Sequence, residues 1–487
     1  FQLARQTFSA LAKKDPSAAN LAYLGMAELF SRNPRGAIAD LGRSVELGNG
    51  SAGVHYYLAL AYLSLQANSR AISELHVAAK RDPSFLPAQS ALGVALLNSG
   101  RPEAALPYLE VAHAHLPRGA DIWASLVRAQ FESGQVEAAM KNIDESTEAM
   151  PDNPHLAATL AFLCLHHHEP QKARQLLENA SALAPRDNNL KILLAHASIK
   201  SNEPMEALAV LKGVPDRAGN PGELAYLRGT AYMLGGDTTK SEGLLARAVS
   251  ADPRNPEYLL SDAALQAVEV HYAAALATLR KLRQLDPRSP QVPYQMAVMY
   301  ALIHRYQDAV RACKETLRLT TQPAEAYYLM GIIRLKQGEF TAAISVLQKA
   351  LSLKPGVAWY HAALGVALFQ AGKLKESQKE LDQALSLRPS IAPAYLWRAR
   401  LFERLGERNK AVVDFEAYTV LQPKSAHAYQ ELEKLYAAEG QPTKAAAARD
   451  RYEELTSGNN ESGSQPSFLD LLLVERIREN LRQVESD

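Results

Sequence analysis

The sequence has little cysteine, little net charge and no long apolar run. Its 487 residues include only two cysteines, Cys164 and Cys313, which are too few for a disulfide framework. No stretch of eighteen apolar residues occurs, so we expect no membrane span. The formal net charge is +1, so no long-range field favours nucleic acid or an anionic membrane as a partner. None of these observations determines the cellular compartment.

The usual motifs of catalysis and nucleotide binding are also missing. The chain has no G-x-x-x-x-G-K-S/T, no G-x-G-x-x-G after a strand, no H-E-x-x-H and no G-x-S-x-G. Consecutive histidines at 166–168 would point about 100° apart on a helix, so they cannot converge on one metal ion, and we assign them to a turn. The carboxylates of Glu315, Glu376 and Asp414 are expected on solvent-exposed helix faces. We therefore expect no enzyme activity, no metal site and no cofactor.

What the sequence does contain is a repeat of 34 residues. The stretch "AAISVLQKALSLKPG" at 342–356 returns 34 residues later as "ESQKELDQALSLRPS". Stepping by 34 gives a row of small residues, and four positions later a row that is mostly large and apolar. The small row is Ala37, Ala71, Ala105, Ala139, Ala173, Ala207, Ser241, Ala275, Ala309, Ala343, Ser377, Ala411 and Ala445. The second row is Leu41, Leu75, Leu109, Ile143, Leu177, Leu211, Leu245, Leu279, Cys313, Leu347, Leu381, Phe415 and Arg449.

Each repeat is predicted to be a hairpin of two helices. In the copy around 326–356 the first apolar helical pattern stops at Gly338, and the second stops before Pro355. Small residues mark positions where two helix backbones come too close for a larger side chain. A second small row lies in the first helices: Gly25, Ala59, Gly93, Val127, Ala161, Ala195, Gly229, Ala263, Ala297, Gly331, Gly365 and Ala399, ending at Glu433.

This pattern resembles the tetratricopeptide repeat (TPR). The features that carry the resemblance are the 34-residue period, the Leu-Gly pair of the first helix (for example Leu364-Gly365), the small and large rows, and the Pro that ends the second helix, such as Pro355. The resemblance covers thirteen units from residue 18 to residue 459. Residues 1–17 look like the second helix of an incomplete repeat, and we expect sequence upstream of them. The implied fold is all-α, a right-handed α-solenoid of helix-turn-helix repeats.

Three places depart from the pattern. Val127 is bulky for its row, and Glu433 with Arg449 breaks both rows in the last unit. The segment "GVPDRAGNPG" at 213–222 replaces the end of a second helix. It is either a joint between two stacks or a softer second helix without a joint, and we favour the softer helix. After the repeats, residues 457–466 are predicted to be a flexible linker and residues 467–487 an amphipathic helix. That helix either caps the last repeats or docks onto a partner.

The resemblance implies a concave groove lined by the first helices, which would bind a protein or peptide. We expect large or charged residues on the groove side to contact the partner: Tyr56, Phe131, Phe162, Tyr226, Met233, Tyr294, Tyr328, Phe369 and Arg400. The alternative is that some of these side chains pack against the next repeat.

The function favoured by the sequence is a non-catalytic scaffold that binds a helix or an extended peptide. One alternative is a targeting array of a larger enzyme, with a transferase or kinase domain upstream. Another is an assembly factor of the bacterial envelope, which would need an upstream signal peptide. The partner and the oligomeric state are open at this point.

Overall fold

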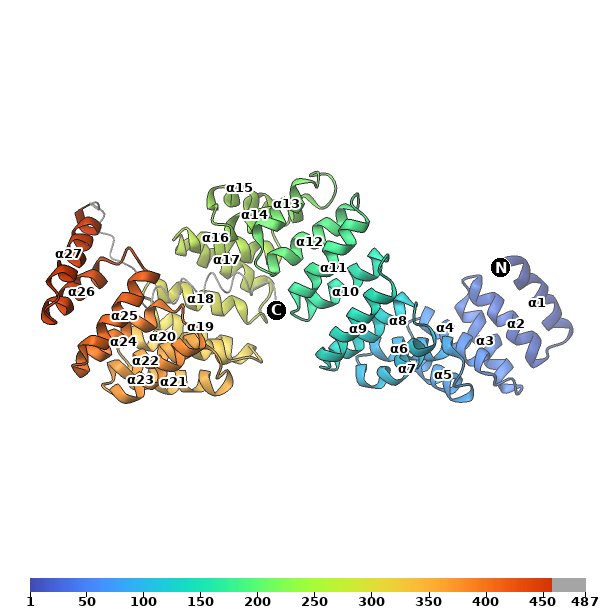
Figure 1. The fold of residues 1–487 in the computed structure, drawn as a ribbon. Coiled ribbons are helices and arrows are strands. Elements are labelled where there is room, and N and C mark those ends of the chain that lie inside the picture. The colour runs from blue at the N-terminus through green and yellow to red at the C-terminus, as the bar shows by residue number, and fades with distance from the viewer. Residues whose placement is uncertain (458–487) are drawn as a thin grey trace. The chain divides into compact units, whose positions relative to one another are not determined.

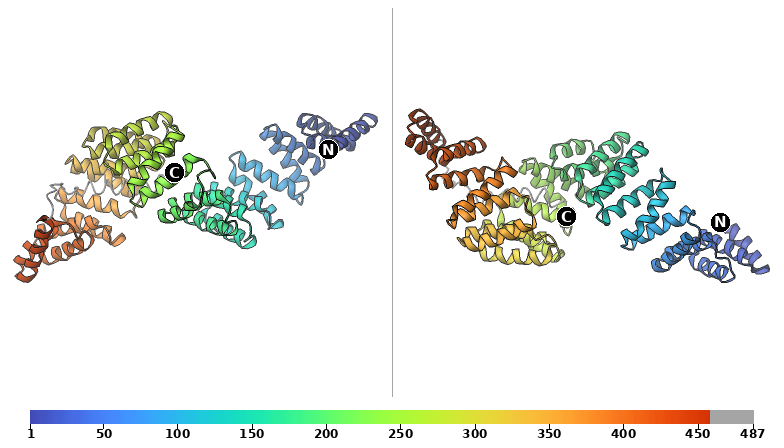
Figure 2. Two further views of the ribbon diagram at one scale, coloured as in Figure 1. Left: turned by 90° about the horizontal axis from the view of Figure 1, so that it is seen from above. Right: turned by 60° about the horizontal axis from the view of Figure 1, so that its bottom comes forward.

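The computed structural model describes residues 1–457 of the chain. These residues form 27 helices and contain no strand. They divide into two compact units, which we call unit 1 (residues 1–218) and unit 2 (residues 219–457). Within each unit, antiparallel helix pairs follow one another along the chain, as Figures 1 and 2 show. The predicted all-α solenoid with a 34-residue period is confirmed.

The bounds of the helices follow the repeat, with even-numbered first helices and odd-numbered second helices. Unit 1 contains α1 (Gln2–Lys14), α2 (Ala18–Phe30), α3 (Pro34–Glu46), α4 (Ala52–Ser64), α5 (Asn68–Arg81), α6 (Leu86–Asn98), α7 (Pro102–His115), α8 (Ala120–Glu132), α9 (Val136–Ala149), α10 (Pro154–His166), α11 (Pro170–Leu183), α12 (Asn188–Lys200) and α13 (Pro204–Lys212). Unit 2 contains α14 (Pro221–Leu234), α15 (Thr238–Ala251), α16 (Pro256–Val268), α17 (Tyr272–Leu285), α18 (Gln291–Leu302), α19 (Tyr306–Leu319), α20 (Ala324–Lys336), α21 (Phe340–Leu353), α22 (Ala358–Gln370), α23 (Leu374–Leu387), α24 (Ala392–Leu405), α25 (Arg408–Leu421), α26 (Ala426–Ala438) and α27 (Pro442–Ser457).

The two helices of a hairpin are held together by a close contact between a small residue and a large one. A Cβ atom added to Gly331 in α20 would lie 2.5 Å from Cγ of Leu347 in α21, and Leu347 is fully buried. The same clash would arise between Gly25 and Leu41 and between Gly93 and Leu109. The small row of the first helices and the large row of the second helices are therefore the two sides of one contact. Its two partners stand sixteen residues apart, and the contact recurs with the 34-residue repeat.

The turn between the two helices has one conformation in all thirteen hairpins. Its central residue has positive φ, and the amide after it donates to the carbonyl five residues back, as in Glu339 N to Arg334 O at 3.0 Å. Seven of these positions hold glycine. The others are Arg32, Gln66, His168, Asn202, Val270 and His304. His168 is thus a turn residue, as the sequence predicted for the histidine run.

The segment 213–222 coincides with the division between the two units. Helix α13 has 9 residues, whereas α11 before it and α15 after it each have 14. The boundary between the units falls between Ala218 and Gly219. The sequence favours a softer second helix without a joint. The helix is shortened, and the division between the units falls in the same segment, so the preference against a joint is not confirmed.

One carboxylate is not where the sequence placed it. Asp414 was expected on a solvent face, but it is 2 % exposed and accepts two hydrogen bonds of 2.7 Å from Arg398. Arg398 also donates to Asp382 at 2.7 Å. Burial raises the pKa of Asp414, and the Arg398 guanidinium acts against that rise. Of the other two carboxylates, Glu376 is exposed and Glu315 pairs with Arg283 at 2.7 Å.

The linker predicted at 457–466 begins at the last described residue, Ser457, and otherwise lies outside the described part of the chain. The amphipathic helix predicted at 467–487 lies outside it entirely. Of the helices that the structure describes, none combines the length and the apolar character needed to cross a membrane.

The contact between Gly331 and Leu347 predicts opposite effects for two glycine substitutions. Gly331→Ala should lower the free energy of unfolding by about 1–3 kcal/mol, because the new methyl group overlaps a buried side chain. Gly243→Ala in α15 should raise it by about 0.5–1 kcal/mol, because nothing lies within 4 Å of the added Cβ and alanine favours helix. Urea unfolding of both variants checks the prediction. Changes of the same sign in the free energy of unfolding would contradict it.

The hairpin turn at Val270 offers a stabilising substitution. Val270 has φ of 65°, which is unfavourable for a β-branched residue, and its side chain is 65 % exposed and so has little packing to lose. Val270→Gly should therefore raise the free energy of unfolding by about 1 kcal/mol. The reverse change at the matching turn, Gly338→Val, should lower it by a similar amount, as measured by thermal melting. A loss of stability in Val270→Gly would show that the turn is not strained.

Candidate functional site

The nine predicted contact residues lie on first helices in both units and do not form one site. Tyr56 (α4), Phe131 (α8) and Phe162 (α10) belong to unit 1, and the other six belong to unit 2. Phe162 is 60 % exposed, and Tyr56, Phe369 and Arg400 are half-buried. The remaining five have less than a tenth of their surface exposed: Phe131, Tyr226, Met233, Tyr294 and Tyr328.

Several of the buried side chains contact the neighbouring hairpin. Phe131 stacks on His167 at a centroid distance of 4.6 Å, and Tyr328 stacks on Tyr360 of the next hairpin at 4.8 Å. Tyr226 lies 5.1 Å from Tyr258, also one hairpin on. The sequence favoured contact with a partner for these residues and left packing against the next repeat as the alternative. The rings of Phe131, Tyr226 and Tyr328 pack against rings of the next hairpin. They do not offer a free surface in this structure.

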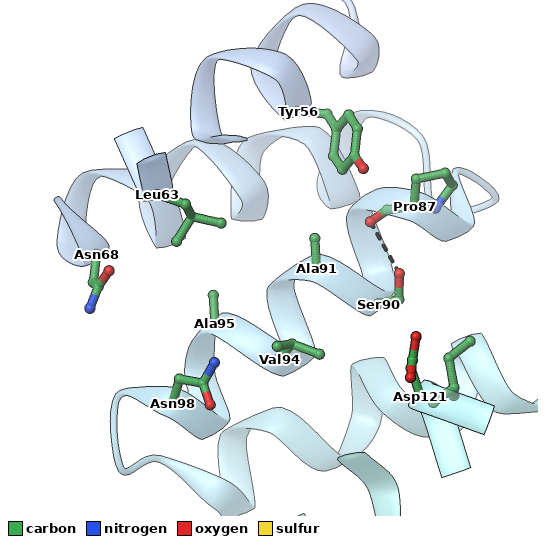
Figure 3. A pocket seen from close by; sticks show the side chains of 11 residues that line it. Tyr56, Leu63, Asn68, Pro87, Ser90, Ala91, Val94, Ala95, Asn98 and Asp121 are labelled. Carbon is green, nitrogen blue, oxygen red and sulfur yellow. Dashed lines mark hydrogen bonds between the residues drawn. The ribbon is translucent and has the colours of Figure 1, made fainter. Parts of the chain in front are cut away.

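An open hollow of about 470 Å³ lies on the first helices of three successive hairpins in unit 1. Figure 3 shows α4 on one side of it, α6 along its floor and α8 on the other side. The residues that line it are Tyr56, Leu63, Asn68, Pro87, Ser90, Ala91, Val94, Ala95, Asn98, Asp121 and Ile122. One of the predicted contact residues, Tyr56, lines this hollow.

Small residues of α6 create the space. Ser90 and Ala91 stand one repeat after Tyr56 and Tyr57, so two large rings in one hairpin are followed by two small side chains in the next. The prediction from the sequence rested on large side chains and therefore missed the floor of the hollow. The signal was nevertheless present, since a Tyr-Tyr pair replaced in phase by Ser-Ala predicts a gap.

An aromatic row leads into the hollow from the start of unit 1. Phe30 of α2 lies 5.9 Å from Tyr57, Tyr57 lies 5.3 Å from Tyr56, and Tyr56 lies 5.4 Å from Phe85. Phe30 is 47 % exposed. Partial burial, and to a smaller extent Tyr57, raise the pKa of Tyr56, so its hydroxyl stays protonated and can donate a hydrogen bond. The row extends the apolar surface beyond the hollow.

The rim of the hollow is polar, with a single acidic side chain. Asn98 Oδ1 accepts a hydrogen bond from Arg128 Nη1 at 3.0 Å, and Arg128 Nε in turn donates to Glu132 at 2.7 Å. Figure 3 shows the Asp121 carboxylate pointing toward α6, where the Ser90 hydroxyl is already bonded to the Pro87 carbonyl. Within residues 1–457 Asp121 forms no ion pair. The hollow thus combines apolar walls with one uncompensated negative charge.

The remaining candidates for chemistry have structural roles. Cys164 and Cys313 are free and buried, and burial raises the pKa of each thiol to about 12, which disfavours the reactive thiolate. His167 packs on Phe131, and His168 occupies a hairpin turn. Among the described residues no group of three or more His, Cys, Asp and Glu side chains is placed to hold a metal ion.

The comparisons with known proteins agree with the repeat pattern. Residues 96–163, 165–230 and 334–401 match a family model described as a tetratricopeptide repeat, and residues 24–84 and 303–358 match a second model with the same description. No curated protein matches the chain.

Similar solved structures include two long proteins and one shorter one. The match to the crystal structure of the APC/C hetero-tetramer Cut9-Hcn1 spans 98 % of this chain and 98 % of that one, with 15 % identity and a TM-score of 0.46. The match to yeast Tom70 spans 97 % of this chain and 97 % of that one, with 16 % identity and a TM-score of 0.39. MamA matches 33 % of this chain and 93 % of its own, with 23 % identity and a TM-score of 0.31. At these values the likenesses carry no argument about partners.

Proposed function

Because the chain belongs to the tetratricopeptide repeat family, we propose that it is a non-catalytic scaffold that binds a protein segment on its first helices. The observation that carries the proposal is the hollow on α4, α6 and α8, where apolar walls, two amides and one carboxylate converge. A mainly apolar concavity with a few polar groups is the usual form of a binding site. A helix or an extended peptide could place one side chain in it.

The chemistry of the hollow favours one kind of peptide. Leu63, Val94 and Ile122 favour an apolar side chain, since its burial removes apolar surface from water. The carboxylate of Asp121, which has no ion-pair partner within residues 1–457, favours a Lys or Arg beside it, and the ring of Tyr56 can also face a cation. We therefore propose a partner segment in which an apolar residue lies next to a basic one.

The contact residues predicted from the sequence enter this proposal unequally. Tyr56 lines the hollow, and Phe162, Phe369 and Arg400 are proposed as further contact positions because part of each side chain reaches solvent. Phe131, Tyr226, Met233, Tyr294 and Tyr328 could contact a partner only if their side chains became accessible, so they are not part of the proposed surface.

A peptide selection tests the proposed function directly. Random twelve-residue peptides displayed on phage are selected against the full chain, and we expect the enriched peptides to carry an apolar residue next to Lys or Arg. Ala91→Trp, which fills the hollow, should weaken their binding at least about tenfold. Asp121→Asn should weaken it by up to about fivefold, as expected for one exposed ion pair.

Ala246→Trp is the matched control, because Ala246 is an exposed alanine of the second helix α15. This variant should bind the selected peptides as the original chain does. The proposal is wrong if no peptides are enriched, or if the enriched peptides bind the Ala91→Trp and Ala246→Trp variants equally well. Thermal melting of each variant confirms that the chain is folded.

A further inference from the structure

Aromatic rings and cationic side chains alternate across three first helices near the end of unit 2. We call this set the arginine ladder: Phe369 (α22), Trp397, Arg400 and Arg404 (α24), and His427 (α26). Phe369 and Trp397 meet edge to face at 5.4 Å. The Arg404 guanidinium lies 5.6 Å from the Phe369 ring, and the Arg400 guanidinium lies 4.9 Å from the Trp397 ring.

The rings hold the two guanidinium groups without using most of their donors. A guanidinium that lies over an aromatic ring is attracted through its face, whereas its five N–H groups lie in its plane. Arg400 uses one donor, Nη2, toward His427 Nε2 at 3.0 Å. Arg404 and His427 are exposed and Arg400 is half-buried, so donors of both arginines can reach a ligand.

A third arginine of the same helix provides a contrast. Arg398 is bound to two carboxylates, those of Asp414 and Asp382, each at 2.7 Å. Arg400 and Arg404 form no ion pair with any of residues 1–457. Helix α24 therefore carries one arginine that forms two ion pairs within the fold, and two that form none with residues 1–457.

The acidic groups nearest the ladder do not cancel its charge. Glu431 accepts a hydrogen bond of 2.8 Å from Lys434 and also lies 3.7 Å from His427. Burial, followed by repulsion from Glu431, raises the pKa of Glu403, and attraction to Arg400 and Lys434 acts against that rise. Glu407 pairs with Lys410 at 2.6 Å. Two of these three carboxylates thus have cationic partners of their own.

We propose that the arginine ladder binds an acidic side chain, Asp or Glu, of a partner segment. A carboxylate can accept two parallel hydrogen bonds from one guanidinium, a geometry that lysine cannot provide. The partly exposed ring of Phe369 would contact an apolar residue beside the acidic one. This inference rests on the proposed function, in which Phe369 and Arg400 are contact positions, and adds the charge of the ligand, which is opposite to that favoured by the hollow in unit 1.

The test measures the affinity of the full chain for a fluorescein-labelled peptide. The peptide has twelve residues, of which four are Glu and the others are Leu or Ala. Its counterpart has Gln in place of every Glu. The original chain should bind the Glu peptide at least about tenfold more tightly than the Gln peptide, as measured by fluorescence anisotropy. The double variant Arg400→Gln, Arg404→Gln should lose this preference.

Arg408→Gln is the control for loss of positive charge, because Arg408 is exposed and lies outside the ladder. It should keep the preference for the Glu peptide. The double variant Arg400→Lys, Arg404→Lys keeps the charge but not the planar donors, and it should bind the Glu peptide more weakly than the original chain does. Melting temperatures of all variants establish that they are folded.

Equal affinity of the original chain for the two peptides would overturn the inference, and so would an unchanged preference in the Arg400→Gln, Arg404→Gln variant. The Ala91→Trp variant separates binding at the arginine ladder from binding in the hollow, since it should leave binding of the Glu peptide unchanged. If Ala91→Trp abolishes binding of the Glu peptide and the arginine variant does not, the arginine ladder is not its site.

Discussion

The close approach of the two helices in each hairpin is the constraint on which the rest of the structure depends. A first-helix residue without a bulky side chain lets Leu of the second helix reach its backbone, as at Gly331 and Leu347. Where Ser replaces Ala in the neighbouring small row, its hydroxyl bonds to the same backbone, as Ser377 does to the Gly365 carbonyl at 2.7 Å. In the last hairpin the two positions hold Glu433 and Arg449, which form an ion pair of 2.7 Å instead. A charged contact thus replaces the apolar one where the described repeats end.

This constraint leaves the groove side of each first helix free to vary. Packing determines the residues at the hairpin contact and at the turn, but not those that face outward from the first helix. Consequently Ser90 and Ala91 can open a hollow in unit 1, while Arg400 and Arg404 bring positive charge that is held against aromatic rings to unit 2. A single repeated fold can in this way carry surfaces of different chemistry, as repeat proteins commonly do.

The parts of the structure that repeat could be predicted from the sequence, and the parts that do not repeat could not. The period, the two small rows and the positions of the turns followed from residues that recur in phase. Asp414 was misplaced because its partner Arg398 lies sixteen residues away on another helix, and a helical face alone does not show a buried ion pair. The burial of Tyr328 depends on a ring of the next hairpin, Tyr360, which stands two residues out of phase. The hollow depends on small side chains, whereas the predicted contact residues were large or charged.

The measurement that tests the central claim most directly is a double-mutant cycle between positions 331 and 347. If one close contact sets the distance between the helices, the cost of Gly331→Ala should largely disappear when Leu347→Ala has already removed the clashing side chain. We predict an interaction free energy of at least about 1 kcal/mol in urea unfolding. Effects of the two substitutions that add to within about 0.5 kcal/mol would contradict the account, because the two rows would then not be two sides of one contact.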